Sequence, residues 1–181
     1  MKQNRELGLR YWKEKTMSDF LLRTIEAKDD SYVLDLNEVN VEVLSPMDEA
    51  KLDYFKKNAE LFQVAEVDGR PAAFLIALRE GLDYTSENYI WFMKEYPQFL
   101  YVDRIVIDEK YRGMGLGRYI YESVFDYARE TGISVVTAEI DTVPYNETSL
   151  KFHEEMGFKE VGEQIIRGGA IQVSLQARDI K

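Results

Sequence analysis

The sequence contains no cysteine and only one histidine, His153, among its 181 residues. Without cysteine there can be no disulfide, no thiol nucleophile and no thiolate metal site. One histidine cannot build a cluster of histidine ligands, so we expect no bound metal. No apolar run approaches the roughly 20 residues of a membrane-spanning helix, and the segment Met1–Lys15 is charged rather than apolar. We therefore expect a cytoplasmic protein with no signal peptide and no membrane partner.

Basic residues are also few relative to acidic ones, with 23 Lys and Arg against 33 Asp and Glu and a net charge of −10. This charge argues against a nucleic-acid partner, because a phosphate backbone would be repelled. It would favour a cationic acceptor such as an amine, although solubility alone explains such a charge. The length and a hydrophobic content of 45% predict one domain with a full core. We place this domain at residues 18–181, after an N-terminal extension over residues 1–17.

The stretch Leu100–Thr131 predicts a strand, a short loop and a helix. Its first part alternates with the period of a strand, and its last part carries an apolar stripe of helical spacing. The stripe consists of Leu116, Ile120, Val124, Tyr127 and Ala128. Between strand and helix lies Arg112–Gly117, in which every second residue from Gly113 is glycine. Glycines ahead of a helix let the backbone approach a ligand, and a helix N-terminus favours an anion such as a phosphate.

Several interpretations of this glycine-rich loop compete. A P-loop needs Gly-Lys-Ser/Thr at its end, but Gly117 is followed by Arg118 and Tyr119. A dinucleotide loop needs Gly-x-Gly-x-x-Gly directly after the strand, and the spacing here differs. A glycine-rich turn that only begins a helix stays open as the simplest alternative. The remaining interpretation is a pyrophosphate loop of the pattern Arg-x-x-Gly-x-Gly.

In that last interpretation, Arg112, Gly115 and Gly117 resemble the pyrophosphate loop of the GNAT superfamily of N-acetyltransferases, which bind acetyl-CoA. A second match is Asn146–Phe158, where the family has Asn, small residues, an aromatic pair and then Gly-Phe. The resemblance covers about Phe20–Lys181, nearly the whole chain. It implies an α/β (α+β) fold with a mixed central sheet of about seven strands and about four helices. It also implies acetyl-CoA as cosubstrate, and homodimers are common in this superfamily.

The resemblance further implies how acetyl-CoA is held. The fourth and fifth strands would splay apart, and the pantetheine arm would lie between them against the backbone of the fourth strand. The N–H groups of the glycine loop would face the pyrophosphate. The residues assigned to cofactor binding are Ile105, Val106, Ile107, Arg112, Gly113, Met114, Gly115, Leu116, Gly117, Arg118, Asn146, Ser149 and Phe152.

Three side chains are candidates for proton transfer. His153 stands where many family members have a tyrosine that acts as general acid near the sulfur. Its ordinary pKa of ~6.5 would suit this role if Glu154 or Glu139 held the pKa up, whereas a histidine bonded to backbone would have a structural role only. Asp103 on the fourth strand and Glu139 on the fifth are alternative bases for the amine proton.

Strand alternation places the side chain of Asp103 with those of Ile105 and Ile107, and the side chain of Arg104 on the opposite face. The acceptor side is expected from Gly81–Phe99, which is dense in aromatic residues between the third and fourth strands. This segment predicts either core packing or a lid or short helix over the acceptor. The residues assigned to acceptor binding are Asn37, Tyr89, Trp91 and Tyr101.

Turn and cap signals predict further elements. Asp68-Gly69 predicts a hairpin between the second and third strands. We expect the first strand over Phe20–Ala27, and a helix that begins at Ser45-Pro46 with Ser45 as N-cap. Asn146 predicts the N-cap of a short helix that Gly157 ends.

The expected function is transfer of an acetyl group from acetyl-CoA to a primary amine of a small molecule or peptide. The transfer would be direct, because no cysteine is present to carry the acetyl group. A non-catalytic acyl-CoA sensor or interaction module is the alternative, and a nucleotide-binding protein that uses the same glycine loop is a third hypothesis.

Overall fold

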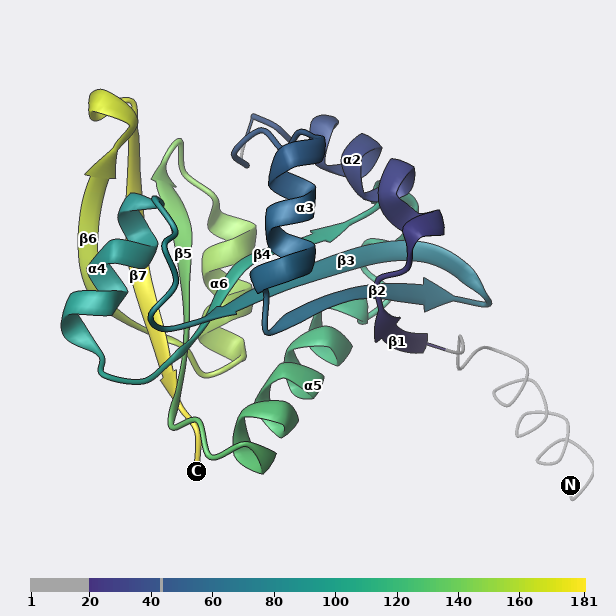
Figure 1. Ribbon diagram of the computed structural model, residues 1–181. Coiled ribbons are helices and arrows are strands. Elements are labelled where there is room, and N and C mark those ends of the chain that lie inside the picture. The colour runs from purple at the N-terminus through teal and green to yellow at the C-terminus, as the bar shows by residue number, and fades with distance from the viewer. Residues whose placement is uncertain (1–19, 43) are drawn as a thin grey trace, which may run out of the picture.

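Seven β-strands form one mixed sheet in the computed structural model, which describes residues 20–42 and 44–181 (Figure 1). The order across the sheet is β1-β2-β3-β4-β5-β7-β6. Every neighbouring pair is antiparallel except β4 and β5, which run parallel. The strands span β1 Phe20–Thr24, β2 Leu61–Val67, β3 Arg70–Arg79, β4 Leu100–Ile107, β5 Val135–Val143, β6 Lys159–Ile166 and β7 Ile171–Asp179.

Helices cover both faces of the sheet (Figure 1). The described α-helices are α2 Asp30–Glu38, α3 Glu49–Asn58, α4 Glu87–Glu95, α5 Leu116–Glu130 and α6 Glu147–Glu155. Short 3-10 turns are η1 Ala27–Asp29, η2 Glu109–Tyr111 and η3 Arg167–Gly169. Buried residues of α2, α3 and α4 pack on one face, and those of α5 pack on the other, with the residues that follow α6. The sheet confirms the predicted fold, and the helix count among the described residues is one above the expected four.

Two further expectations concern the N-terminal extension and membrane-spanning helices. The N-terminal extension predicted over residues 1–17 lies outside the described residues. Within the part of the chain that the structure describes, no helix has both the length and the apolar character needed to cross a bilayer.

Two predicted boundaries are wrong for identifiable reasons. Strand β1 ends at Thr24, because the carboxylate of Asp29 accepts hydrogen bonds from Arg23 and from the backbone N–H of Glu26 and so turns the chain away from the sheet. Helix α3 begins at Glu49 rather than at Ser45-Pro46. Its N-cap is Asp48, whose side chain accepts from the backbone N–H of Lys51 at 2.8 Å. The hairpin turn at Asp68-Gly69 and the cap of α6 by Asn146 are confirmed.

Strand β4 changes its phase at Asp103. Ile76 of β3 pairs with Arg104 and Ala77 pairs with Val102, so Asp103 is an extra residue that forms a bulge. Tyr101 and Arg104 consequently lie on the α3 face, while Val102 and Ile105 lie on the α5 face. The predicted alternation, which placed Asp103 and Arg104 on opposite faces, is therefore broken at the bulge.

The parallel pair β4–β5 separates soon after it begins. Its only paired positions in the described structure are Leu100 with Val136 and Tyr101 with Thr137. Beyond this point β4 remains bonded to β3, and β5 remains bonded to β7. The two central strands therefore open into a gap, as the family resemblance implied, and from the bulge onward β4 has no paired position with β5 among the described residues.

Candidate active site

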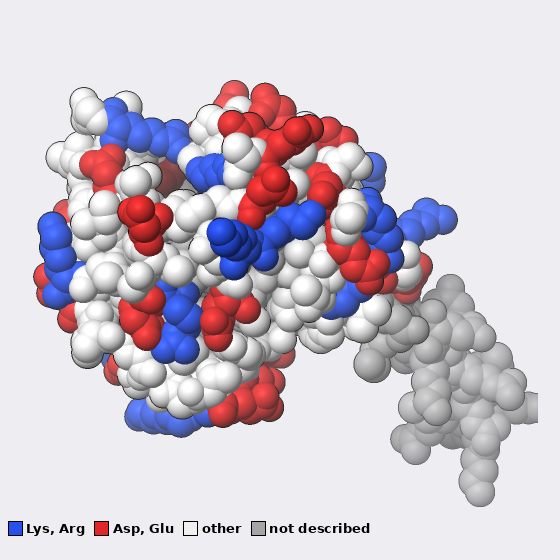
Figure 2. Space-filling view, in the orientation of Figure 1, with Lys and Arg blue, Asp and Glu red and all other residues white. Residues whose placement is uncertain are grey.

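A cavity of about 800 Å³ occupies the gap between β4 and β5. One end lies against α5 and α6, and the other lies between α3, the segment before α4 and the tip of the β6–β7 hairpin. Figure 2 shows the surface hollowed between that hairpin and the α3 region, with basic side chains at the rim. The cavity thus connects the first turn of α5 with a polar chamber on the opposite side. This chamber is lined by Lys51, Asp103, Glu139 and Arg167, among others.

The glycine loop leads into Gly117, which lines the first end of the cavity. Gly113 and Gly115 have φ values of 76° and 90°, which favour glycine. Gly115 is the N-cap of α5 and provides no side-chain hydrogen bond, so the first N–H groups of the helix are left for a ligand. A Cβ on Gly117 would lie 3.4 Å from both Ile107 and Phe152, so glycine keeps α5 close to the cavity wall.

The predicted cofactor residues divide into three groups. Six line the cavity: Ile105, Ile107, Gly117, Asn146, Ser149 and Phe152. Val106 and Leu116 have buried side chains in the two core clusters, so only their backbone groups can serve a ligand. The others form the exposed loop, where Arg112 donates to Asn40 Oδ1 at 3.2 Å and Arg118 pairs with Glu155 at 3.5 Å.

Glu139 brings a carboxylate from β5 to the middle of the cavity. Its Oε1 accepts a 2.8 Å hydrogen bond from the hydroxyl of Tyr101, and its buried Oε2 has no hydrogen-bond partner among the described residues. Burial, followed by the charge of Asp103, raises the pKa of Glu139 to about 8. Such a carboxyl group titrates near neutral pH, as a general base for an amine requires.

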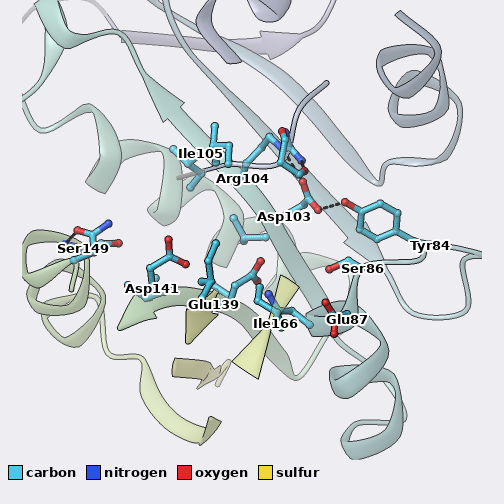
Figure 3. A pocket seen from close by; sticks show the side chains of 18 of the residues that line it. Tyr84, Ser86, Glu87, Asp103, Arg104, Ile105, Glu139, Asp141, Ser149 and Ile166 are labelled. Atoms are coloured by element: carbon cyan, nitrogen blue, oxygen red, sulfur yellow. Dashed lines mark hydrogen bonds and ion pairs between the residues drawn. The ribbon is translucent and has the colours of Figure 1, made fainter. Parts of the chain in front are cut away.

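Asp103 faces Glu139 from the bulge of β4, and both side chains line the cavity (Figure 3). Its Oδ1 accepts a 2.5 Å hydrogen bond from Tyr84, and its Oδ2 lies 2.7 Å from Nε of Arg104. The expectation that Arg104 points away from Asp103 is therefore wrong. The bulge removes the alternation and lets two consecutive side chains form a buried ion pair.

Arg104 is held by residues from outside the sheet. Its guanidinium donates to Asn37 Oδ1 at 2.6 Å and to the hydroxyl of Ser45 at 2.9 Å. Asn37, assigned to acceptor binding, is fully buried and does not line the cavity; it positions Arg104 instead. Ser45, expected as a helix cap, joins the same network.

The aromatic acceptor candidates lie behind the cavity. Tyr89 is 1% exposed, and its hydroxyl bonds to backbone at Arg79 and Leu82. Trp91 packs against Gly162 of β6. Tyr101 is also buried and acts through its bond to Glu139. The structure therefore brings none of the three to the cavity wall, where Tyr84 of the same aromatic segment is found.

His153 has both ring nitrogens engaged. Nδ1 lies 2.7 Å from the carbonyl oxygen of Ser149, and Nε2 lies 2.7 Å from the hydroxyl of Tyr121. Burial lowers the pKa of His153, and the bond to Ser149 only partly opposes this shift. The condition set for His153 as general acid, a carboxylate that holds its pKa up, is not met among the described residues, and the bond to Ser149 fits the alternative of a histidine bonded to backbone.

Several cavity residues were absent from the sequence-based assignment. Tyr121 lies one position beyond Ile120 of the predicted stripe, and its place beside α6 depends on how the two helices pack. Lys51 and Arg167 reach the cavity from elements distant in sequence, so no local pattern marks them. Arg104 could have been suspected from its charge inside an apolar strand. No group of three or more metal-ligating side chains is found in residues 20–42 and 44–181.

Comparison with solved structures shows which class this fold represents. The ribosomal-protein-S18-alanine N-acetyltransferase from Escherichia coli superposes with a TM-score of 0.67 at 17% identity, over 90% of this chain and 95% of that one. NAA60 of Arabidopsis thaliana, solved in complex with acetyl-CoA, superposes with a TM-score of 0.72 at 14% identity, over 90% and 100%. At these identities the likeness shows the fold alone, which is that of the GNAT acetyltransferases.

Sequence comparison shows the family. The model of the Acetyltransferase (GNAT) family matches residues 22–158, and the chain belongs to this family. An uncharacterized N-acetyltransferase of Methanocaldococcus jannaschii is 24% identical over 113 residues, which are 62% of this chain and 44% of that relative. The match therefore spans less than half the length of the relative.

Proposed function

We propose that this chain is an acetyl-CoA-dependent N-acetyltransferase that acetylates a primary amine directly. One observation carries the proposal: a single cavity extends through the gap between β4 and β5 from Gly117, in the first turn of α5 directly after the glycine loop, to the carboxylates Asp103 and Glu139. This arrangement suits a long thioester at one end and an amine at the other.

The residues present fit acetyl-CoA. The loop Arg112–Gly117 and the first turn of α5 offer N–H groups to a pyrophosphate. At Ile105–Ile107, β4 is not paired with β5, so backbone groups on that side can bond an extended amide chain in the gap. Phe152 and Ser149 line the gap from α6. When bound, acetyl-CoA would supply the acetyl group and a thiolate leaving group.

The amine proton is assigned to Glu139. Its pKa of about 8 lets the carboxylate form near neutral pH, and Tyr101 fixes its orientation. Asp103 is the second candidate, but Tyr84 and Arg104 already occupy both of its oxygens. Its negative charge raises the proton affinity of Glu139, so Asp103 acts as a positioning and tuning residue.

The proton for the departing thiolate is assigned to Tyr121. Tyr121 lines the cavity, and in its hydrogen-bonded pair with His153 the phenol carries the proton, which would pass to the thiolate when the hydroxyl turns from Nε2 toward the cavity. His153 orients this phenol. Both ring nitrogens of His153 are hydrogen-bonded, so the histidine cannot itself serve as the expected acid. This observation also favours a second candidate function, a non-catalytic acyl-CoA sensor.

Calorimetric titration with acetyl-CoA, with ATP and NAD as controls, tests the first half of the proposal. Saturable binding of acetyl-CoA alone is expected. Release of free thiol in the presence of an amine panel then separates the enzyme from the sensor. Binding without thiol release for any amine would favour the sensor, and absence of acetyl-CoA binding would overturn both functions.

A further inference from the structure

Two cations reach the acceptor end of the cavity from separate elements. Lys51 lies in the first turn of α3, and Arg167 begins the turn η3 between β6 and β7. Both line the cavity. Neither forms an ion pair with an acidic side chain within residues 20–42 and 44–181. Arg104, the third cation of the lining, is already paired with Asp103.

Lys51 is held in place without being neutralised. Its ammonium donates to the hydroxyl of Ser45 at 2.7 Å and to the carbonyl oxygen of Pro46 at 3.3 Å, which are both uncharged. Two of its three N–H donors are thus occupied, and one is left. Burial, followed by the charge of Arg104, lowers the pKa of Lys51, and Arg167 contributes to the same shift. An anion beside Lys51 would stabilise the charged ammonium and so oppose this lowering of the pKa.

Arg167 is presented to the chamber by a fixed backbone. Its φ is 51°, and its backbone N–H donates to Oε1 of Glu87 at 3.2 Å, which ties the hairpin tip to the start of α4. No hydrogen bond from its guanidinium is found among the described residues. Five N–H donors in a planar fork therefore remain available, and this geometry matches a carboxylate or phosphonate.

The same chamber is acidic on its inner side. Asp103, Glu139 and Asp141 line it from β4 and β5 (Figure 3). The charge of Asp103 acts on Lys51, and that of Arg167 acts on Asp141, so the two sets of charges lie in one space. The chamber therefore has carboxyl groups on its inner side, which can accept hydrogen bonds from an ammonium group, and a positive rim.

We propose that the acceptor is a small amino acid or another small amine with an anionic group, and that Lys51 and Arg167 bind this anion. The inference rests on the proposed acetyltransferase function and narrows its acceptor. A peptide N-terminus would leave Lys51 and Arg167 without an anion, because the carboxylate of a peptide lies far from its terminal amine. The stacked rings of Tyr54 and Tyr84, 5.9 Å apart, form an aromatic wall for the acceptor side chain.

The test compares acceptors that share a side chain and keep, neutralise or lack the carboxylate. Each triplet contains an L-amino acid, its amide and the amine without the carboxyl carbon, with leucine, methionine or phenylalanine side chains. Thiol release is measured with acetyl-CoA for the wild type, Lys51→Met and Arg167→Gln. Lys57→Met, exposed on the same helix, and Arg70→Gln, exposed at the start of β3, are the matched controls.

We expect at least one acid to have kcat/KM roughly tenfold or more above its amide, because a charge-assisted contact is lost in the amide. Lys51→Met and Arg167→Gln should each remove most of this preference by raising KM for the acid far more than KM for the amide, while the affinity for acetyl-CoA, measured by calorimetry, reports on folding of the site. The two control variants should retain the preference.

The outcomes separate this inference from the proposed function. If neutral amines are acetylated as well as the acids, or if both variants keep the preference, the anion site is wrong while the transferase stands. If acetyl-CoA is bound and no amine releases thiol, the transferase proposal fails. Calorimetric titration of the CoA-loaded protein with each triplet then tests the anion site. Equal affinities for acid and amide, or no binding of either, would overturn the proposed anion site.

Discussion

The hydroxyl of Tyr121 donates a hydrogen bond to Nε2 of His153 over 2.7 Å. The direction follows from the other side of the ring, where the carbonyl oxygen of Ser149 can only accept. Nδ1 must therefore carry the proton, and in a neutral imidazole Nε2 is then an acceptor. In this pair the phenol of Tyr121 has a proton that it can donate, whereas the one N–H of His153 is bonded to the carbonyl oxygen of Ser149.

Replacing Tyr121 by phenylalanine should lower kcat about a hundredfold, since general acid catalysis contributes at least this much. His153→Phe keeps a ring among its aromatic neighbours and should lower kcat only a few-fold. Steady-state rates of thiol release measure both. The pH profile of the wild-type kcat should show no inflection from a histidine near pH ~6.5, because the pKa of His153 is lowered.

The opposite ranking of the two variants would identify His153 as the proton donor. The affinity for acetyl-CoA, measured by calorimetry, is the control for folding of the site. It should be equal in both variants and in the wild type.

The carboxyl group of Glu139 should make stability depend on pH. Its pKa is raised from 4.5 to about 8, so between these values the folded state binds a proton more tightly than the unfolded state. Its contribution is complete below about pH 4.5 and is lost as the pH rises toward 8. The loss is at most about 1.4 kcal/mol per pH unit.

Urea unfolding of the wild type, Glu139→Gln and the exposed control Glu122→Gln at pH 5 and pH 8 measures this effect. Glu139→Gln should lose less stability between the two pH values than the wild type, and Glu122→Gln should behave as the wild type does. Parallel pH dependence in all three proteins would contradict the raised pKa.

Alanine at Gly115 should weaken acetyl-CoA binding. The residue has a φ of 90°, which costs an L-residue about 1–2 kcal/mol, and relief of this strain would turn the loop N–H groups away from the pyrophosphate. We expect the Kd to rise about tenfold or more. Gly132→Ala is the matched control, since its φ is 72° at the far end of the same helix. It should lower stability similarly but leave the Kd unchanged; equal Kd values for the two variants would argue against the loop.

Valine at Gly162 should destabilise the fold through Trp91. A Cβ at this position would lie 2.7 Å from Cζ2 of the indole. Overpacking of this kind costs about 1–3 kcal/mol, which urea unfolding can measure. Trp91→Leu in the same chain should recover part of the loss, because it removes the opposing ring. No recovery in the double variant would mean that β6 itself cannot accept a side chain there.

Local signals predicted much of the fold. The hairpin at Asp68-Gly69, the glycine loop before α5 and the cap of α6 by Asn146 each depend on residues within a few positions of one another. The same holds for the apolar stripe of α5, in which Leu116, Ile120 and Val124 are buried. Such features are decided by backbone conformation and by side chains that bond to their own turn.

The acceptor side was predicted poorly because it depends on contacts between distant segments. The aromatic segment 81–99 indicated an acceptor site, but Tyr84 is its one aromatic residue that lines the cavity. The other aromatic side chains of the segment pack around Tyr89 and Trp91 instead. Lys51 and Arg167 meet there from elements more than a hundred positions apart. No spacing in the sequence contains that information.

The amino-acid sequence was enough to predict the glycine loop before α5 and the family resemblance, because both rest on short motifs, and the resemblance in turn implied the seven-stranded sheet. Only the tertiary structure decided which side chains meet. The bulge at Asp103 arises from pairing with β3 and turns Arg104 toward Asn37. The packing of α5 against α6 places Tyr121 on His153, and burial there lowers the pKa of the histidine. Both outcomes depend on register and burial, which a linear pattern does not encode.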